Sequence, residues 1–415
     1  MRIAIFFLII AGIPALTLAY WWWADRRLRP LPGARWYRLA LAVFSLATVI
    51  AFGSIVGTRI YSSLTGNYTE FALPKAWQAL VMMWGLIILP FIAVPLMGAV
   101  GLKNLGVWIT RRFKPKSEHD AVATEDAREP ATDDATKTVS RRDLLRATLA
   151  GAPAVATLGA TLYSIPQLNR FRIREITLNL PSLPQALDGL TIAQLSDTHV
   201  GRLTNGSVLA DIAKATNDLQ ADLVVSTGDL INHNPKDLPT AIRMLDQLDR
   251  RSGLAIIEGN HDLFMDRALG QGSFHRGMRD AHMPLLVDET QTFIVRGQKV
   301  QILGARWSND RWDRPIANLL EQRDPDAFPI LLDHHPHAFD AAADAGLPLT
   351  LAGHTHGGQL HLTHEFGPGP LMYKYWSGHY TQNNAHLVVS NGTGNWFPLR
   401  TNAPAEIIHL TLRSA

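Results

Sequence analysis

The 415-residue sequence contains no cysteine. Disulfide bonds, zinc sites built from thiolates and cysteine nucleophiles are therefore excluded. Histidine is almost missing from the first part of the chain, because His119 is the only one of the 16 histidines that precedes residue 166. Histidines on an ordinary surface would be scattered along the chain. This distribution therefore predicts that imidazole chemistry, and metal binding in particular, belongs to the second part.

Charged side chains are missing from four long stretches near the N-terminus, although 18% of all residues are charged. Each stretch is close to the length of about 20 apolar residues that spans a bilayer core. The sequence predicts a membrane domain with three transmembrane helices at 1–112, a fourth apolar helix within 140–166 and a separate domain at 167–415. Residues 113–139, rich in Asp, Glu, Ala and Thr, predict a disordered cytosolic linker. The uncharged stretches are 3–23, 39–57, 76–102 and 147–165.

Basic residues predict the orientation of these helices. The loop after the first stretch carries five arginines, whereas the loop after the second carries only Arg59 and Lys75. Because basic loops stay in the cytosol, the N-terminus and the residues after 166 are expected on the outer face. The net charge is only +3 and its basic residues cluster beside apolar segments, so no nucleic-acid partner is predicted. The five arginines are Arg26, Arg27, Arg29, Arg35 and Arg38.

A pair of arginines, Arg141 and Arg142, stands shortly before the fourth stretch. The pair and the Ala/Gly/Thr-rich run after it resemble a twin-arginine export signal, which implies the twin-arginine export machinery as a partner. The alternative is an ordinary basic flank of a transmembrane helix. Both interpretations predict a multi-pass protein of the bacterial inner membrane with a periplasmic C-terminal domain. The sequence Ala154-Val155-Ala156 lies too near the middle of the run for signal cleavage, so we expect the fourth helix to remain.

Residues 172–412 alternate between runs that predict strands and runs that predict helices. Apolar residues at helical spacing predict helices at 207–219 and 237–248, and short apolar runs are typical of buried strands. Strands that alternate with helices indicate a parallel or mixed sheet, and the later strands without helices between them indicate a second sheet. The predicted fold class is α/β, with two packed β-sheets flanked by helices. The strand-like runs are 190–195, 223–226, 254–257, 293–295, 300–303, 330–332, 349–351, 386–390 and 406–412.

Five of these predicted strands are followed directly by Asp, His or Asn. Because sites in open α/β sheets form where strands end, these loops predict one pocket assembled from distant parts of the chain. Short motifs such as Asp-x-His and Gly-Asp are weak alone, whereas two histidines bracketed by glycines are more specific, since glycine lets the backbone approach closely. The five motifs are Asp197-Thr198-His199, Gly228-Asp229, Gly259-Asn260-His261-Asp262, His334-His335-Pro336 and Gly353-His354-Thr355-His356.

In this order the motifs resemble those of the calcineurin-like metallophosphoesterase superfamily, over residues 172–412. The resemblance implies a metallophosphoesterase-like double β-sheet sandwich, preceded here by an all-α membrane domain. Gln359 after the last motif, Pro398-x-Arg400 and Pro404-x-Glu406 look like one branch of that superfamily. The branch holds membrane-associated phosphodiesterases, including UDP-diacylglucosamine pyrophosphatases.

The resemblance also implies two divalent metal ions, a bridging carboxylate and a proton donor. The proton donor falls on His261, with Asp262 expected to orient its ring. His335 is the alternative to His334 if the register of that motif slips. The implied ligands are Asp197, His199 and His356 for the first ion, Asn260, His334 and His354 for the second, and Asp229 for both.

These residue types suit the hydrolysis of a phosphate ester. Two cations would clamp the phosphate oxygens and bring the pKa of a bridging water towards neutrality, which supplies a hydroxide nucleophile. Mixed Asp, His and Asn ligands favour Mn, Fe or Zn over Mg.

We therefore expect a membrane-anchored phosphodiesterase or pyrophosphatase that acts at the lipid bilayer on lipid-linked, envelope or small-molecule phosphates. A broad-range phosphomonoesterase is one alternative. A non-catalytic membrane sensor is another, which the presence of every ligand residue disfavours. Four tryptophans are candidates for an apolar lip for acyl chains, although packing is the commoner role of such residues. They are Trp307, Trp312, Trp376 and Trp396.

Overall fold

The computed structural model describes residues 2–65, 73–113, 140–249, 251, 253–308, 316–361, 363, 367 and 369–415, apart from the side chains of residues 2–9, 63 and 111. The chain forms two compact units, of which one comprises Met1–Ile60 with Phe71–Leu162 and the other Tyr61–Glu70 with Tyr163–Ala415. The predicted linker at 113–139 lies, apart from Phe113, outside the described residues.

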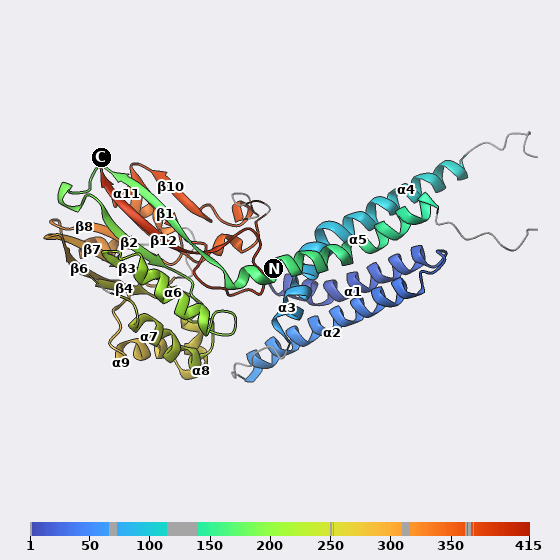
Figure 1. Ribbon diagram of the computed structural model, residues 1–415, viewed down its shortest axis with the longest axis horizontal. Helices are drawn as coiled ribbons and strands as arrows, with labels where there is room; N and C mark the ends of the chain where they lie inside the picture. Colours follow the sequence, from blue (N-terminus) through green and yellow to red (C-terminus); the bar gives the residue numbers. More distant parts are fainter. Residues whose placement is uncertain are drawn as a thin grey trace, which may run out of the picture. The chain divides into compact units, whose positions relative to one another are not determined.

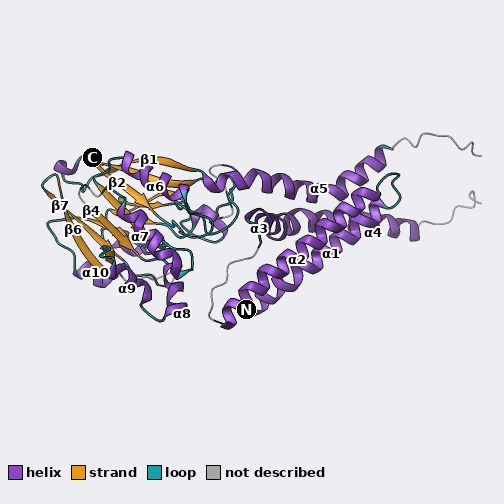
Figure 2. Ribbon diagram, turned by 60° about the horizontal axis from the view of Figure 1, so that its bottom comes forward, coloured by secondary structure: helices purple, strands orange, loops and turns teal. Residues whose placement is uncertain are grey.

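The first unit consists of long helices that run alongside one another (Figures 1 and 2). Two buried hydrogen bonds join its segments: the Trp84 indole N–H donates to the Thr17 hydroxyl at 2.9 Å, and the Tyr20 hydroxyl donates to the Ala150 carbonyl at 2.7 Å. Polar groups in an apolar interior need such partners, so these contacts hold the helices in one arrangement. The helices are α1 (Arg2–Leu28), α2 (Arg35–Thr65), α3 (Lys75–Met82), α4 (Val94–Arg112) and α5 (Arg141–Ser164).

Three helical segments of the described chain are long and apolar enough to cross a membrane: Arg35–Ser62, Lys75–Thr110 and Arg141–Asn169. They contain the second, third and fourth predicted spans. The first predicted span, residues 3–23, falls within α1, but its first side chains lie outside the described residues.

The segment that carries the third predicted span is not a uniform α-helix. Between α3 and α4, residues Met83–Ala93 form a π-helical stretch that contains Pro90. Proline has no N–H to donate, and its ring collides with the carbonyl four residues earlier in a regular α-helix. The wider π turn accommodates the proline, so the apolar segment continues through it.

The second unit is built on two six-stranded sheets. In the first sheet β2, β3, β4 and β5 are parallel to one another, β12 is antiparallel to β2, and β1 is parallel to β12. In the second sheet β7, β8, β9 and β11 are parallel, and β6 and β10 are antiparallel at the two edges. The strand order of the first sheet is β1 (Phe171–Leu180), β12 (Ala405–Ser414), β2 (Leu190–Leu195), β3 (Leu223–Thr227), β4 (Gly253–Ile257) and β5 (Leu285–Leu286). The strand order of the second sheet is β10 (Gly378–Gln382), β11 (Ala385–Val389), β9 (Leu349–Ala352), β8 (Phe328–Leu332), β7 (Gln298–Gly304) and β6 (Glu289–Val295).

The two sheets pack face to face around one apolar core. Ile192 and Val225 of the first sheet belong to the same buried cluster as Ile302 and Ile330 of the second. Because side chains alternate across a strand, Ala193, the neighbour of Ile192, faces the other way and packs with helices instead. The fold class predicted from the sequence, a double sheet flanked by helices, is confirmed.

Helices cover the outer faces of both sheets (Figure 1). Two of them are predicted from the sequence: α6 spans Ser207–Asp218 and α7 spans Leu238–Asp246, within a few residues of the expected bounds. The shorter helices carry too few apolar positions for a periodic signal. They are α8 (Met265–Leu269), α9 (Ser273–Asp280), α10 (Ala317–Glu321) and α11 (Ala338–Asp344).

Candidate metal centre

All five motifs lie directly after the carboxyl ends of strands. The loops after β2, β3 and β4 come from the first sheet, and the loops after β8 and β9 come from the second. Since both sheets contribute, the site could form only when the two sheets pack together. Backbone hydrogen bonds tie the loops to one another: Asp197 N–H donates to the Gly228 carbonyl at 2.9 Å, and Gly353 N–H donates to the His334 carbonyl at 3.1 Å.

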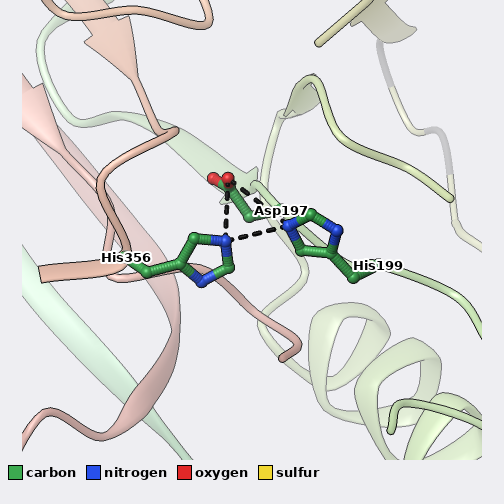
Figure 3. Close-up of side chains that lie close together, drawn as sticks. All are labelled: Asp197, His199 and His356. Atoms are coloured by element: carbon green, nitrogen blue, oxygen red, sulfur yellow. Dashed lines mark hydrogen bonds and ion pairs between the residues drawn. The ribbon is translucent and has the colours of Figure 1, made fainter. Parts of the chain in front are cut away.

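One cluster of donor atoms consists of Asp197, His199 and His356 (Figure 3). The Nε2 atoms of the two histidines lie 2.9 Å apart, and Asp197 Oδ1 lies 3.1 Å from the Nε2 of His356. All three side chains are buried. One carboxylate oxygen and two imidazole nitrogens that converge in this way match the donor set of a divalent cation.

A second cluster consists of Asp229, His334 and His354. Asp229 Oδ2 lies 3.2 Å from His334 Nε2 and 3.6 Å from His199 Nε2, so one carboxylate oxygen faces both clusters. Asn260 completes this side, because its Oδ1 lies 2.9 Å from His354 Nδ1. The structure therefore brings together all seven side chains that the sequence predicts as ligands.

The choice between the two adjacent histidines is also visible in the geometry. His334 reaches Asp229 and lies 3.3 Å from His354 Nδ1, while its own Nδ1 donates to the Thr227 carbonyl at 2.7 Å. His335 instead stacks on His337 with ring centroids 4.0 Å apart. His334 thus lies in the cluster, and His335 lines the cavity beside it.

Burial and the neighbouring rings set the charge state of two of the histidines, His199 and His354. Burial lowers the pKa of His199 and of His354, and the adjacent imidazoles lower both further. These rings are therefore neutral and keep a nitrogen lone pair for a cation. Burial would raise the pKa of Asp197, but His356, His334 and the Ser196 hydroxyl hold it below its ordinary value, so this carboxylate is ionised.

Five of the clustered residues have an unusual backbone conformation. Positive φ angles, which are uncommon for residues other than glycine, occur at each of them. Such conformations persist where the surrounding structure holds them, and they concentrate at functional sites. The residues are Asp197 (50°), His199 (45°), Asp229 (54°), His354 (68°) and His356 (52°).

Glycines make room for the histidine rings. At Gly228, where φ is +93°, a Cβ atom would lie 2.7 Å from His334 Nδ1, and at Gly392, where φ is +80°, it would lie 2.5 Å from His356 Nδ1. Both approaches are too close for any side chain, so these two positions require glycine. Gly228 was part of a predicted motif, whereas Gly392 was not identified from the sequence.

The predicted proton donor, His261, lies against the first cluster, with ring centroids 4.6 Å from His199. Its Nδ1 lies 2.7 Å from the Asn232 carbonyl, so Nδ1 carries the proton and Nε2 is left for the reaction. Its backbone N–H donates to Asp229 Oδ1 at 2.7 Å. Burial lowers the pKa of His261, and Asp229 and the Asn232 carbonyl oppose that effect.

The expected role of Asp262 is corrected by these contacts. The Asp262 carboxylate does not hold the His261 ring; it accepts backbone N–H groups from Gly259 at 2.9 Å and from Ile231 at 3.0 Å. The ring is oriented by the carbonyl of Asn232 instead. Asp262 is fully buried, and burial together with nearby Asp229 raises its pKa well above the ordinary range. Through its two hydrogen bonds to backbone N–H groups, Asp262 positions the loop that carries Asn260 and His261.

Two buried charged residues support the loop beside His356. Arg400 is fully buried and donates to the carbonyls of Gly394 and Ala403, at 2.8 and 2.6 Å. Glu406, also fully buried, pairs with Arg172 at 2.8 Å and accepts the Asn391 N–H at 3.0 Å. The sequence singled out Arg400 and Glu406 only as family resemblance. Their structural role is to hold the segment from Asn391 to Asn395, which contains Gly392.

Two cavities open at the cluster. The smaller, about 170 Å³, is lined by predicted ligands together with His261, Tyr373 and Trp396. The larger, about 310 Å³, shares Asn260 and His354 with it and is bordered by Trp307. Of the four tryptophans considered for an apolar lip, Trp376 packs on His361 and Trp312 lies outside the described residues.

Comparison with known proteins agrees with this geometry. Residues 190–358 match the family profile described as calcineurin-like phosphoesterase. The chain is 30% identical to the uncharacterized metallophosphoesterase YkuE of Bacillus subtilis, over 67% of this chain and 99% of that protein. It is 27% identical to a transmembrane protein with metallophosphoesterase domain of Danio rerio, over 59% of this chain and 58% of that protein. An uncharacterized metallophosphoesterase of Campylobacter jejuni is 28% identical over 58% of this chain and 63% of its own length.

The match to the Bacillus protein covers nearly its whole length, and relatives such as the Danio rerio protein combine this domain with transmembrane character. The donor set, its position at the strand ends and these similarities lead to the same conclusion. This chain belongs to the calcineurin-like metallophosphoesterase family.

Proposed function

We propose that this protein is a membrane-anchored phosphoesterase that uses two divalent cations to hydrolyse phosphodiester or pyrophosphate bonds of lipid-linked or envelope substrates. The observation that carries the proposal is the position of Asp229, whose Oδ2 faces His334 of one cluster and His199 of the other. A carboxylate shared by two donor clusters is the arrangement that a dinuclear site requires.

The donors fit two borderline cations. Asp197, His199 and His356 would hold the first, Asn260, His334 and His354 the second, and Asp229 both. Nitrogen-rich donor sets of this kind favour Mn, Fe or Zn. When bound, the cations would neutralise charge on the phosphoryl oxygens and lower the pKa of a water molecule.

The part of the reaction that falls to the chain itself is proton delivery. The Asn232 carbonyl keeps the proton of His261 on Nδ1 and turns Nε2 away from Asn232. Nε2 would take up a proton from solvent in the cavity that His261 lines, and the imidazolium would then pass this proton to the oxygen of the departing group and return to the neutral ring. Burial lowers the pKa of His261, which favours release of the proton, and Asp229 offsets part of this lowering.

Substrate and location are proposed together. The membrane-type helices and the transmembrane relatives support a protein that works at a bilayer. The arginine distribution supports a bacterial inner-membrane protein with a periplasmic domain, exported with help from the twin-arginine machinery. UDP-diacylglucosamine, the substrate of one similar branch, is a cytosolic precursor, so the orientation of the domain decides between the two substrate pools.

The catalytic proposal is tested with the full chain solubilised in detergent. We expect protein stripped by a chelator to be inactive towards bis(p-nitrophenyl) phosphate and to regain activity with Mn²⁺, because both donor clusters need a cation. The same preparation assayed with p-nitrophenyl phosphate distinguishes a diesterase from the alternative, a phosphomonoesterase. Equal activity of stripped and Mn²⁺-loaded protein would rule out the metal-dependent mechanism.

The orientation is tested with reporter fusions. A phosphatase reporter placed after Ala415 should be active, and a reporter that needs the cytosol should be inactive. The reason is that the basic loops stay in the cytosol, which leaves the C-terminus on the outer face. Replacing both Arg141 and Arg142 by lysine keeps the charge, so it should block export only if a twin-arginine receptor reads the pair. An inactive phosphatase fusion together with an active cytosolic reporter fusion would contradict the proposed orientation.

A further inference from the structure

The larger cavity beside the cluster has a chemical character of its own. It encloses about 310 Å³, at the lower end of the size of ligand pockets. Within the described part of the chain, no carboxylate lines it, and Arg267 is its only lysine or arginine. Besides Asn260 and His354, its walls are formed by Leu263, Phe264, Arg267, Trp307, Ser308 and His335. A cavity with aromatic walls and one permanent positive charge fits an anionic group attached to an organic molecule.

Arg267 is held in place by stacking. Its guanidinium carbon lies 4.6 Å from the centroid of the Phe264 ring. Among the described residues it forms no salt bridge, since the neighbouring Asp266 accepts the backbone N–H groups of Gly272 and Phe274. A guanidinium that rests on an aromatic face keeps its N–H donors available for a ligand.

The same phenylalanine connects Arg267 with the predicted proton donor. The Phe264 ring packs edge to face against His261, with centroids 4.9 Å apart, and His233 stacks on it with centroids 5.1 Å apart. One aromatic ring thus separates the guanidinium from the imidazole that would protonate the leaving oxygen. His261 itself lines the smaller cavity, which shares Asn260 and His354 with the larger one, so a substituent on that leaving oxygen can extend into the larger cavity towards Arg267.

We propose that Arg267 binds a phosphate carried by the leaving group, so that the enzyme prefers pyrophosphate-type substrates to diesters with an uncharged leaving group. The inference rests on the proposed function, because it takes His261 as the residue that faces the leaving oxygen. Arginine suits this role, since its planar N–H donors match phosphate oxygens. Arg267 is then a specificity-determining residue that acts on the substrate and not on the metal.

The test compares two matched substrates, bis(p-nitrophenyl) phosphate and P1,P2-bis(p-nitrophenyl) pyrophosphate, with the Mn²⁺-loaded full chain in detergent. For Arg267→Ala we expect kcat/KM to fall about 10–100-fold with the pyrophosphate, mainly through KM, and less than about 3-fold with the diester. Arg267→Lys should recover part of the loss, because it restores charge without the planar donors. Arg279→Ala, at an exposed arginine near the end of α9, is the matched control and should change neither substrate.

Equal losses with both substrates, or no loss with the pyrophosphate, would overturn the role of Arg267. If the wild-type chain hydrolyses neither substrate, the proposed function fails, and the cavity is then tested by binding. The methylene analogue of the pyrophosphate, which cannot be cleaved, should bind the wild type and Arg279→Ala about 10–100-fold more tightly than Arg267→Ala. Equal affinities for the three proteins would overturn the inference independently of any activity.

Discussion

Replacing Asp229 by asparagine should remove bound metal and activity together. Its Oδ2 faces His334 at 3.2 Å and His199 at 3.6 Å, while its Oδ1 accepts the His261 N–H at 2.7 Å. Asparagine can keep the bond to His261 but presents an uncharged amide N–H₂ to both donor clusters. Replacing a residue that only supports a metal ligand lowers metal affinity or activity about 10–100-fold. Replacing a ligand shared by both ions should therefore lower kcat/KM by at least about 10³-fold.

The measurement is metal content after gel filtration, alongside hydrolysis of bis(p-nitrophenyl) phosphate. Wild type should retain about two equivalents of Mn²⁺, as a dinuclear site requires, and Asp229→Asn less than half of that amount. Asp280→Asn, an exposed aspartate at the end of α9, controls for loss of one negative charge and should behave as wild type. An Asp229→Asn protein with its full metal content would show that Asp229 is not shared between the ions.

Replacing His261 by glutamine should leave metal content unchanged and lower kcat by about 10²–10⁴-fold. Glutamine can reach the Asn232 carbonyl with its amide, so the loop should be kept, but it cannot transfer a proton. The loss should shrink as the leaving group improves, because a good leaving group departs without protonation. A series of aryl phosphodiesters with leaving-group pKa values on both sides of p-nitrophenol measures this dependence.

A competing role for His261 is visible in the geometry, because its ring also groups with His199 and Asp229 as a set of donor atoms. If His261 is a ligand, His261→Gln should lose metal, and the loss of rate should be the same for every leaving group. His379→Gln, on an exposed histidine of β10, is the control and should match wild type in both measurements.

The strands that carry the site could be predicted because their signals are local. The strand β2 spans Leu190–Leu195, the same residues as the predicted run, in which Thr191 and Gln194 are the polar positions, and β3, β4, β8 and β9 differ by only one or two residues at their ends. Strands buried on both faces are mostly apolar along their whole length, so they stand out from the polar loops on either side. The same reasoning holds for the membrane-type segments, where length and lack of charge are sufficient.

The edge strands β1 and β10 gave no such signal. In β1 (Phe171–Leu180) charged residues alternate with apolar ones, and β10 (Gly378–Gln382) contains mostly polar residues, because each lies at the edge of its sheet. The position of β1 depends on a partner far along the chain: Arg172 and Arg174 pair with Glu406 of β12. No local pattern in either segment could have identified that pairing.

The sequence by itself determined which Asp, His and Asn side chains gather, since residues directly after buried strands lie at the carboxyl-terminal ends of those strands. Only the tertiary structure decided how they combine. The packing of the two sheets brings His354 against Asn260, whereas the conformations of the loops after β3 and β4 direct the Asp262 carboxylate to backbone N–H groups and the His261 ring to the Asn232 carbonyl. The helical segment after β4 places Arg267 over Phe264 beside the cavity. These contacts depend on loop conformation and on the distance between the sheets. Neither property produces a periodic pattern of residues from which it could be predicted.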